Sequence, residues 1–211
     1  MIVIINPNST MSMTQAMLAT AQKASPNAQI HAVTSHDGPP AIQGREDGEA
    51  CVPALLKLVD KASRDGARVI IIGCFDDTGL DAARAVATCP VIGIGQAAYH
   101  LAALAGPRFS VVTTLDVSTP ILAENITKYG LEGHLGKVRA SGVPVLALET
   151  DVTSSAERVL DEISRSQSED NIQSVVLGCA GMSHIPNLAG PDIKVRLIDG
   201  VQAATQIGAI L

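Results

Sequence analysis

Two apolar runs in this chain each end in Gly-Cys, and this repeated unit constrains the fold more than any other feature. Residues 69–74 read Val-Ile-Ile-Ile-Gly-Cys, and residues 174–179 read Ser-Val-Val-Leu-Gly-Cys. Short aliphatic runs bounded by glycine are typical of buried strands. Each cysteine therefore lies where a buried strand opens into a loop, which is the usual place for a ligand site in an open α/β sheet.

The order of elements around the cysteines also repeats. Asn8 follows a first apolar strand and precedes Cys74 by 66 residues, and Thr113 ends a later strand and precedes Cys179 by the same number. A further strand and a helix follow in both halves. A period near 105 residues is too long for a solenoid. We therefore predict an α/β fold of two pseudo-symmetric lobes, with both cysteines facing one site between them.

Strand and helix patterns alternate along the whole chain, which predicts mostly parallel sheets with right-handed crossovers. The expected strands are 2–5, 29–33, 68–73, 91–94, 109–114, 143–148, 173–178 and 194–198. The expected helices are 12–24, 48–64, 79–87, 96–105, 118–129, 153–167 and 200–210. We expect irregular structure over 35–48 and 130–142, and the first of these is long enough to serve as a binding loop.

The last expected helix is assigned to the first lobe. The first lobe is then predicted to contain residues 1–95 together with 200–211, and the second lobe residues 96–199. The helix over 96–105 is expected to cross to the second lobe in the same way. This exchange follows from the duplication, because the two helices occupy matching places in the two halves.

The composition of the chain limits the kinds of molecule that it can be expected to bind. A net charge of −6 and an isoelectric point near 5.3 argue against nucleic acid, which needs a basic surface to displace counterions. No apolar run approaches the roughly 20 residues that span a bilayer, and the chain starts directly with a strand rather than a signal segment. We expect a cytoplasmic protein with reduced cysteines that acts on a small molecule.

The two repeated thiols suggest acid/base chemistry. A thiol near a helix N-terminus is expected to have a pKa lowered from about 8.5 toward neutrality. One such thiolate can remove a proton from a carbon beside a carbonyl, and a second thiol on the opposite face can return one. Cys51 and Cys89 lack this setting and are expected to be structural. The four cysteines show no zinc-binding spacing, and no metal or other cofactor is expected.

Polar residues at the ends of the two matching strands are candidate substrate contacts. Asn8 lies in Asn6-Pro7-Asn8-Ser9-Thr10 and supplies an amide at the expected sheet edge. Thr113 and Thr114 occupy the matching place in the second half. The same residues also suit an ordinary helix N-terminus, so both interpretations remain open.

One motif suggests a different function. Gly93-Ile-Gly-Gln-Ala-Ala98 matches a dinucleotide-binding pattern after a strand, and Asp116 follows about 20 residues later, as such a site requires. An oxidoreductase that uses Gly93, Gly95 and Asp116 is therefore an alternative, although it leaves the paired cysteines unexplained. A non-catalytic binding protein on the same scaffold is a third hypothesis.

Four motifs together resemble the hydantoin racemase and allantoin racemase branch of the aspartate/glutamate racemase superfamily. They are Asn6-Pro-Asn-Ser-Thr10, Gly73-Cys-Phe-Asp-Asp77, Phe109-Ser-Val-Val-Thr-Thr114 and Leu177-Gly-Cys-Ala-Gly-Met182. The resemblance implies two α/β lobes, a cofactor-independent two-base mechanism, a homo-oligomer, and Cys74 with Cys179 as the acid/base pair. The substrate contacts that it implies are Asn8, Phe75, Thr113, Thr114, Ala180 and Gly181.

The residues that follow each cysteine distinguish the members of this superfamily by the kind of substrate they bind. Amino-acid racemases of this superfamily have polar groups there that hold an α-carboxylate. Here Phe75 and Asp76 follow one cysteine, and Ala180 and Gly181 follow the other. These residues better suit a neutral cyclic ureide, so we expect a 5-substituted hydantoin or allantoin as substrate. A free amino acid remains an alternative.

Overall fold

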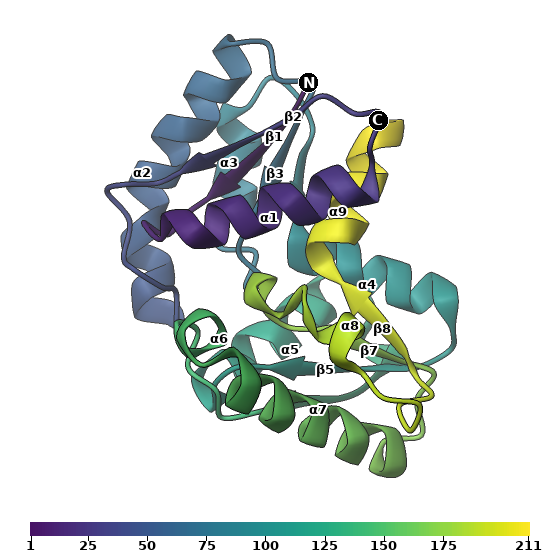
Figure 1. Cartoon of the computed structure of the whole chain (residues 1–211). Helices are drawn as coiled ribbons and strands as arrows, with labels where there is room; N and C mark the ends of the chain where they lie inside the picture. Colours follow the sequence, from purple (N-terminus) through teal and green to yellow (C-terminus); the bar gives the residue numbers. More distant parts are fainter.

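The computed structural model describes residues 1–211 and contains two four-stranded parallel sheets, one in each lobe (Figure 1). In the first sheet the order is β2-β1-β3-β4, and in the second it is β6-β5-β7-β8. The strands are β1 (Ile2–Asn6), β2 (Ile30–Thr34), β3 (Val69–Ile72), β4 (Val91–Gly93), β5 (Phe109–Thr113), β6 (Leu135–Ala140), β7 (Ser174–Leu177) and β8 (Arg196–Asp199). The two orders are equivalent under the duplication, so the predicted fold class is confirmed.

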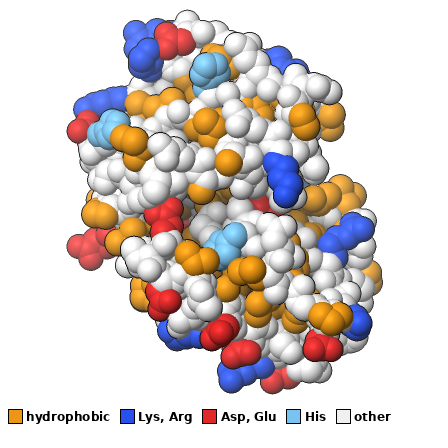
Figure 2. Space-filling model, viewed as in Figure 1, with side chains coloured by type: hydrophobic (Ala, Val, Ile, Leu, Met, Phe, Trp, Pro, Cys, Tyr) orange, Lys and Arg blue, Asp and Glu red, His pale blue; other side chains and the backbone are white.

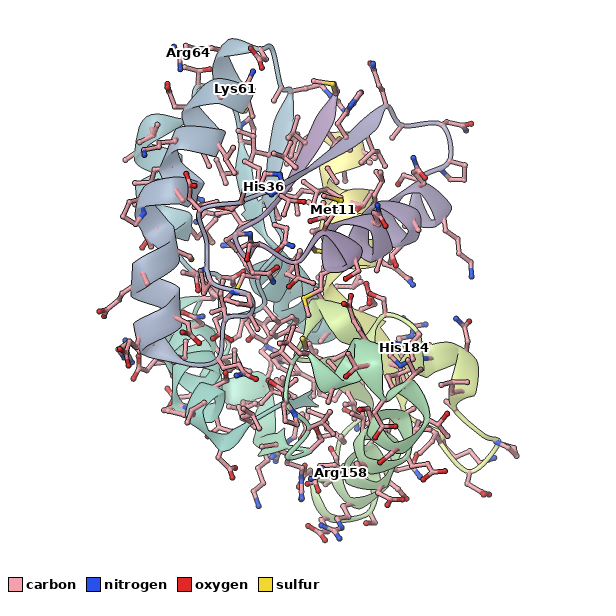
Figure 3. The ribbon with its side chains drawn as sticks, turned by 60° about the vertical axis from the view of Figure 1, so that its left-hand side comes forward. Met11, His36, Lys61, Arg64, Arg158 and His184 are labelled. Atoms are coloured by element: carbon pink, nitrogen blue, oxygen red, sulfur yellow. The ribbon has the colours of Figure 1, made fainter.

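Helices cover both faces of each sheet. They are α1 (Met11–Ala24), α2 (Arg45–Arg64), α3 (Leu80–Val86), α4 (Ile94–Ala105), α5 (Thr119–Lys128), α6 (Ala147–Thr150), α7 (Val152–Glu169), α8 (Ile185–Leu188) and α9 (Gly200–Ile210). After a turn of the view, Lys61 and Arg64 lie at the end of α2 that is remote from the second lobe (Figure 3). None of these helices has the length and apolarity required to cross a membrane.

Burial on both faces explains the unbroken apolar strands. In β1, Ile2 and Ile4 pack toward α1 and α9, whereas Val3 and Ile5 pack toward α2. The second sheet follows the same rule, with one face against α4 and α5 and the other against α7. Strands of parallel sheets covered on both sides need apolar residues at every position rather than at alternate ones.

The helices α4 and α9 join the lobes. They pack against each other, with α4 contacting β7 and β8 of the second sheet, while α9 contacts β1 and β3 of the first. A side-chain carbon added at Gly208 of α9 would lie 3.3 Å from Val69. We propose on this basis that the lobes comprise residues 1–95 with 200–211 and residues 96–199.

The strand predicted at 143–148 is wrong. The sixth strand is β6, inside the segment that was expected to be irregular, and 144–150 forms turns and the short helix α6. The apolar spacing of Val143, Val145 and Leu148 reflects burial in the core and beside the site rather than strand pairing. As the edge strand of its sheet, β6 is mostly only partly buried and carries Gly136, Lys137 and Arg139 between its apolar residues, so its pattern was not recognisable from the sequence.

Candidate active site between the two lobes

Cys74 is placed by the pairing of the two central strands of the first sheet. The backbone N–H of Gly73 donates to the carbonyl of Ile5, 2.8 Å away, and extends the ladder between β1 and β3 by one residue. A side-chain carbon at Gly73 would lie 2.6 Å from the sulfur of Met17, so a larger residue here would require the Met17 side chain to move. The chain then turns away, and Cys74 as a whole is 9% exposed.

Cys179 is placed by the equivalent pairing in the second sheet. The Gly178 N–H donates to the carbonyl of Val112, 2.8 Å away, and the Cys179 carbonyl accepts from Met182 at 3.0 Å to close a short turn. A side-chain carbon at Gly178 would lie 2.8 Å from Thr113. The two Gly-Cys units are therefore placed by the same backbone hydrogen bond to the neighbouring strand, although Gly178 is crowded by that strand and Gly73 by the Met17 side chain of α1.

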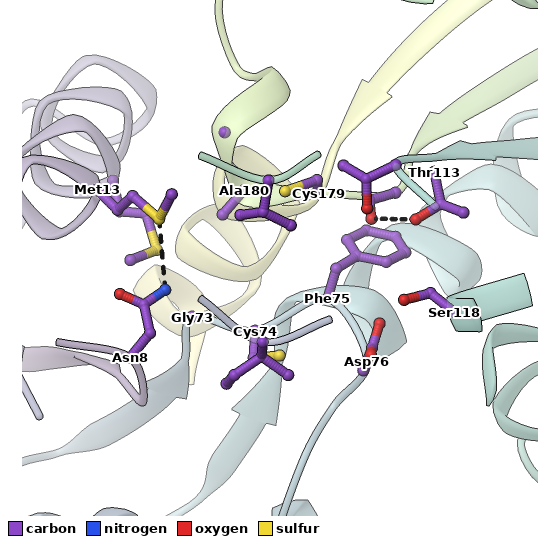
Figure 4. Close-up of a pocket in the computed structure, with 16 residues that line it drawn as sticks. Asn8, Met13, Gly73, Cys74, Phe75, Asp76, Thr113, Ser118, Cys179 and Ala180 are labelled. Atoms are coloured by element: carbon purple, nitrogen blue, oxygen red, sulfur yellow. Dashed lines mark hydrogen bonds between the residues drawn. The ribbon is translucent and has the colours of Figure 1, made fainter. Parts of the chain in front are cut away.

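Both cysteines line one small cavity between the lobes (Figure 4). Cys74 enters it from the first lobe and Cys179 from the second, and the space-filling view shows the surface hollowed between the lobes (Figure 2). All nine predicted site residues line this cavity: Asn8, Cys74, Phe75, Asp76, Thr113, Thr114, Cys179, Ala180 and Gly181. The arrangement gives one bound molecule a thiol on each of two sides.

Seven further residues of the lining were not predicted. They are Met13, Met17, Ile42, Gly73, Ser118, Val145 and Gly178. The spacing of Met13 and Met17 on α1, directly after the Asn8 turn, was a usable signal because residues four apart share one helix face. Ile42 lies in the loop that was expected to serve binding. Val145 was missed because residues 143–148 were predicted to form a strand.

Asn8 is held by its neighbours so that one group remains for a ligand. Its side-chain oxygen accepts from the Asn6 amide at 2.8 Å and from the Thr10 N–H at 2.9 Å. Its side-chain N–H₂ group has only the sulfur of Met13, at 3.4 Å, which is a weak acceptor. The Asn8 amide can therefore donate to a ligand oxygen in the cavity.

The threonine pair of the second lobe is also fixed. The hydroxyl of Thr113 donates to the Gly178 carbonyl at 3.0 Å, which holds β5 against the Cys179 loop. The backbone carbonyl of Thr114 accepts from Gly142 at 2.8 Å. Thr113 is therefore committed to the loop that carries the cysteine, whereas Thr114 has no such side-chain bond.

The expectation of low thiol pKa values is wrong for this structure. Burial raises the pKa of Cys179 to about 12, against a weaker opposing effect of the Gly181 N–H. Burial also raises the pKa of Cys74 well above its ordinary value, and the carboxyl of Asp76 raises it further. The N–H groups after each cysteine do favour the thiolate, but desolvation outweighs them because no cation lies nearby. Both groups are thiols at neutral pH.

Two adjacent carboxyls in the Cys74 loop differ in their partners. Asp76 lines the cavity, and burial raises its pKa to about 7, with one carboxyl oxygen left without a hydrogen-bond partner. Asp77 points the other way. It accepts from the N–H groups of Gly95 at 3.0 Å and Gln96 at 2.7 Å, and from the Tyr129 hydroxyl at 2.8 Å.

This capping by Asp77 overturns the dinucleotide interpretation. The free N–H groups at the start of α4, which would bind a pyrophosphate, already bind the Asp77 carboxylate. The two glycines make room for that contact, because a side-chain carbon at Gly93 would lie 2.0 Å from Asp77 and one at Gly95 would lie 2.4 Å from the Phe75 carbonyl. The motif is therefore structural. Asp116 lies in a short 3₁₀ turn, and neither it nor the two glycines line the cavity.

Comparison with known proteins identifies the family. A family model described as Asp/Glu/Hydantoin racemase matches residues 2–208. The chain is 43% identical to a hydantoin racemase of Rhizobium meliloti over 99% of this chain and 87% of that protein. It is 34% identical to a hydantoin racemase of Pseudomonas sp. strain NS671 over 96% of this chain and 82% of that protein.

A solved structure agrees with this result. The allantoin racemase from Klebsiella pneumoniae superposes with a TM-score of 0.95 at 35% identity, and the match covers 100% of this chain and 86% of that one. The resemblance seen in the four sequence motifs is confirmed. The chain is an isomerase that belongs to the Asp/Glu/hydantoin racemase family.

Proposed function

We propose that this protein racemises a cyclic ureide, either a 5-substituted hydantoin or allantoin, at the acidic ring carbon, with Cys74 and Cys179 as the acid/base pair. The observation that carries the proposal is the placement of two thiols from opposite lobes in one cavity. A carbon held between them can lose its proton to one sulfur and receive a proton from the other, which inverts its configuration.

The raised thiol pKa values agree with this chemistry. A thiolate that is desolvated by burial is a stronger base than one in water, which helps against a weakly acidic carbon–hydrogen bond. The disadvantage of a raised pKa is that only a small fraction of each cysteine is ionised at neutral pH. The N–H of Asp76 toward Cys74 and that of Gly181 toward Cys179 hold the charge while it exists.

The lining of the cavity supports a neutral ligand. It contains no Lys or Arg, and its one carboxyl group is that of Asp76. An amino acid would bring a carboxylate into this space with no cation to pair with it, at a substantial desolvation cost. The amide of Asn8 and the buried Asp76 carboxyl instead offer a donor and an acceptor to the carbonyl and N–H groups of a ureide ring.

The predicted substrate contacts come from both lobes. Asn8, Phe75 and Asp76 would contact the ring from the first lobe, while Thr113, Thr114, Ala180 and Gly181 would do so from the second. The enolate oxygen formed during the reaction would be stabilised by backbone N–H groups near the cysteines. Catalysis without a cofactor, assembly as a homo-oligomer and a cytoplasmic location remain predictions.

Polarimetry with a substrate panel tests the proposal. The panel contains allantoin, benzyl-, isopropyl- and methylthioethyl-hydantoin, aspartate and glutamate. We expect loss of optical rotation with at least one ureide and none with the two amino acids. Racemisation of an amino acid alone would contradict the assignment and favour the amino-acid alternative.

A further inference from the structure

An open groove borders the Cys74 loop outside the cavity. Gly48 and Glu49 of α2 line it, together with Thr78 of the loop and Glu124 of α5. We call this the side groove. Cys74 lines only the cavity, Thr78 lines only the side groove, and Asp76 lines both. The loop from Cys74 to Gly79 therefore separates the cavity from the side groove.

A hydroxyl of this loop contacts the Cys74 sulfur. The Thr78 Oγ1 lies 3.6 Å from the Cys74 Sγ, and either atom can be the donor. Thr78 is half-buried, so its hydroxyl contacts the sulfur on one side and the groove on the other. Gly48 of α2 lies beside it, and a side-chain carbon there would be in ordinary contact with the Thr78 Oγ1, 3.4 Å away.

The second lobe has no equivalent contact. Ser183 stands the same number of residues after Cys179 as Thr78 does after Cys74, but its hydroxyl bonds the Asp199 carboxylate and the carbonyl of Ala180. Cys179 itself is more exposed than Cys74. The two lobes therefore differ at this point, because only Cys74, the more deeply buried thiol, has a hydroxyl group in contact with its sulfur.

The proposed function creates the need for such a contact, so a role of Thr78 in proton exchange rests on that function. Each inversion leaves the two thiols with exchanged protonation states, because the base has gained a proton and the acid has lost one. The next molecule of the same enantiomer needs the original states. Cys74 must therefore exchange a proton with water between turnovers, although it is almost fully buried.

We propose that the Thr78 hydroxyl carries protons between the Cys74 thiol and water in the side groove. The S–H bond of Cys74 breaks as its proton passes to the Thr78 oxygen, while the proton already on that oxygen passes to a groove water. The products are a thiolate, an unchanged hydroxyl and a hydronium ion, and the reverse path restores the thiol. The carboxylates of Glu49 and Glu124 border the groove, together with the carboxyl groups of Asp76 and Asp77, and favour the departing positive charge. Arg45 is already paired with Glu124 at 2.9 Å.

Hydrogen exchange at sulfur tests this without any substrate. The infrared S–H band of Cys74, assigned by its absence from Cys74→Ala, is followed after rapid mixing with D₂O. We expect Thr78→Val to slow conversion to S–D by about 100-fold, the contribution of a positioned proton-transfer group. Thr78→Ser should keep the wild-type rate, and the Cys179 band should be unaffected in both variants.

Kinetics supply a second measurement. In Thr78→Val, racemisation at low substrate should fall because the Cys74 thiolate loses the hydroxyl that supports it. The rate at saturating substrate should fall further, because return of the free enzyme to its starting state becomes limiting. Cys74 exchange in Thr78→Val at the wild-type rate would overturn the proposal, as would equal slowing in Thr78→Ser. A wild-type protein that racemises no ureide would refute the proposed function instead, and the exchange rates would still decide the proton route.

Discussion

At the scale of single residues, the chemistry depends on thiols that are protonated at rest. Desolvation dominates the pKa values of Cys74 and Cys179, and each thiolate is supported only by a backbone N–H and, for Cys74, by the Thr78 hydroxyl. The site therefore favours a strong but rarely populated base over a stable thiolate.

The first prediction concerns single cysteine variants. Cys74→Ser and Cys179→Ser should each abolish racemisation, because inversion needs both thiols and serine is a far weaker base. The remaining cysteine should still exchange the ring hydrogen of one enantiomer in D₂O without inverting it, as measured by NMR. The two variants should prefer opposite enantiomers. Equal exchange of both enantiomers by one variant would refute a two-base mechanism.

The second prediction follows from the raised pKa of Cys179, which is about 12. Below that value the group is a thiol, so its thiolate fraction and its alkylation rate should keep rising with pH through the range from 7 to 10. In urea-unfolded protein the rise should level off near the ordinary pKa of 9.0. Labelling sites are read by mass spectrometry, and substrate should protect Cys74 and Cys179. A folded-state plateau near neutral pH would show a stabilised thiolate.

At the scale of elements, the edge strand β6 depends on one buried cation. Arg139 of β6 bonds Asp170 at 2.5 Å, Glu162 at 3.0 Å and Glu169 at 2.6 Å, all on or just after α7. Asp170 also accepts from the hydroxyl of Ser110 at 2.7 Å. Charge pairing thus ties together α7, β5 and an edge strand whose apolar residues Leu135 and Val138 are only partly buried.

The third prediction is that Arg139→Met destabilises the protein by about 3–5 kcal/mol, because it leaves buried carboxylates without their cation. Arg165→Met is the control, since Arg165 makes one longer, exposed contact with Glu162, and it should change the free energy of unfolding by less than about 1 kcal/mol. Urea denaturation monitored by circular dichroism measures both. Similar losses in the two variants would contradict the argument.

The same cluster predicts a pH dependence. Burial alone would raise the pKa of Asp170, but hydrogen bonds from Arg139 and Ser110 outweigh it and lower the pKa below 3.8. A lowered folded-state pKa means that the stabilisation is present above the unfolded value and is lost as the pH falls through the folded one. The urea midpoint should therefore decline below pH 4 in the wild type and decline less in Asp170→Asn.

At the scale of the whole molecule, the exchange of α4 and α9 makes the lobes interdependent. One continuous core contains residues from both sheets and from these two helices. Contacts also cross the mouth of the site, where the Val145 N–H of the second lobe donates to the Gln43 side chain of the first at 3.0 Å. Neither lobe buries its apolar surface alone, and the cavity exists only when both are in place.

The fifth prediction is that deletion of residues 200–211 abolishes cooperative unfolding and activity, although every cavity-lining residue remains. The deletion uncovers the face of the first sheet that includes Ile2 and Ile71. Deletion of Ile210 and Leu211 alone is the control, because these residues are 84% and 56% exposed and should be dispensable. Thermal denaturation distinguishes the two, and a native-like transition in the longer deletion would contradict the role of α9.

The sequence by itself determined that the chain folds into two matching lobes, because the same order of strand, Gly-Cys and helix occurs twice. It also indicated the residues at the carboxyl ends of the central strands, since parallel strands end at one edge of a sheet. Local signals were enough there. They did not identify β6, because its polar residues are stabilised by ion pairs with α7. They also did not identify Val145, which lines the cavity from a turn.

Tertiary structure alone decided the electrostatics. Whether Cys74 is a thiol or a thiolate depends on how much water surrounds it and on the placement of the Asp76 carboxyl, which are properties of the packed lobes. The glycine motif at 93–98 is equally ambiguous in sequence, because a helix N-terminus binds a pyrophosphate and an Asp77 carboxylate by the same N–H groups. Only the fold shows which anion is present, because it brings Asp77 from the preceding loop onto α4.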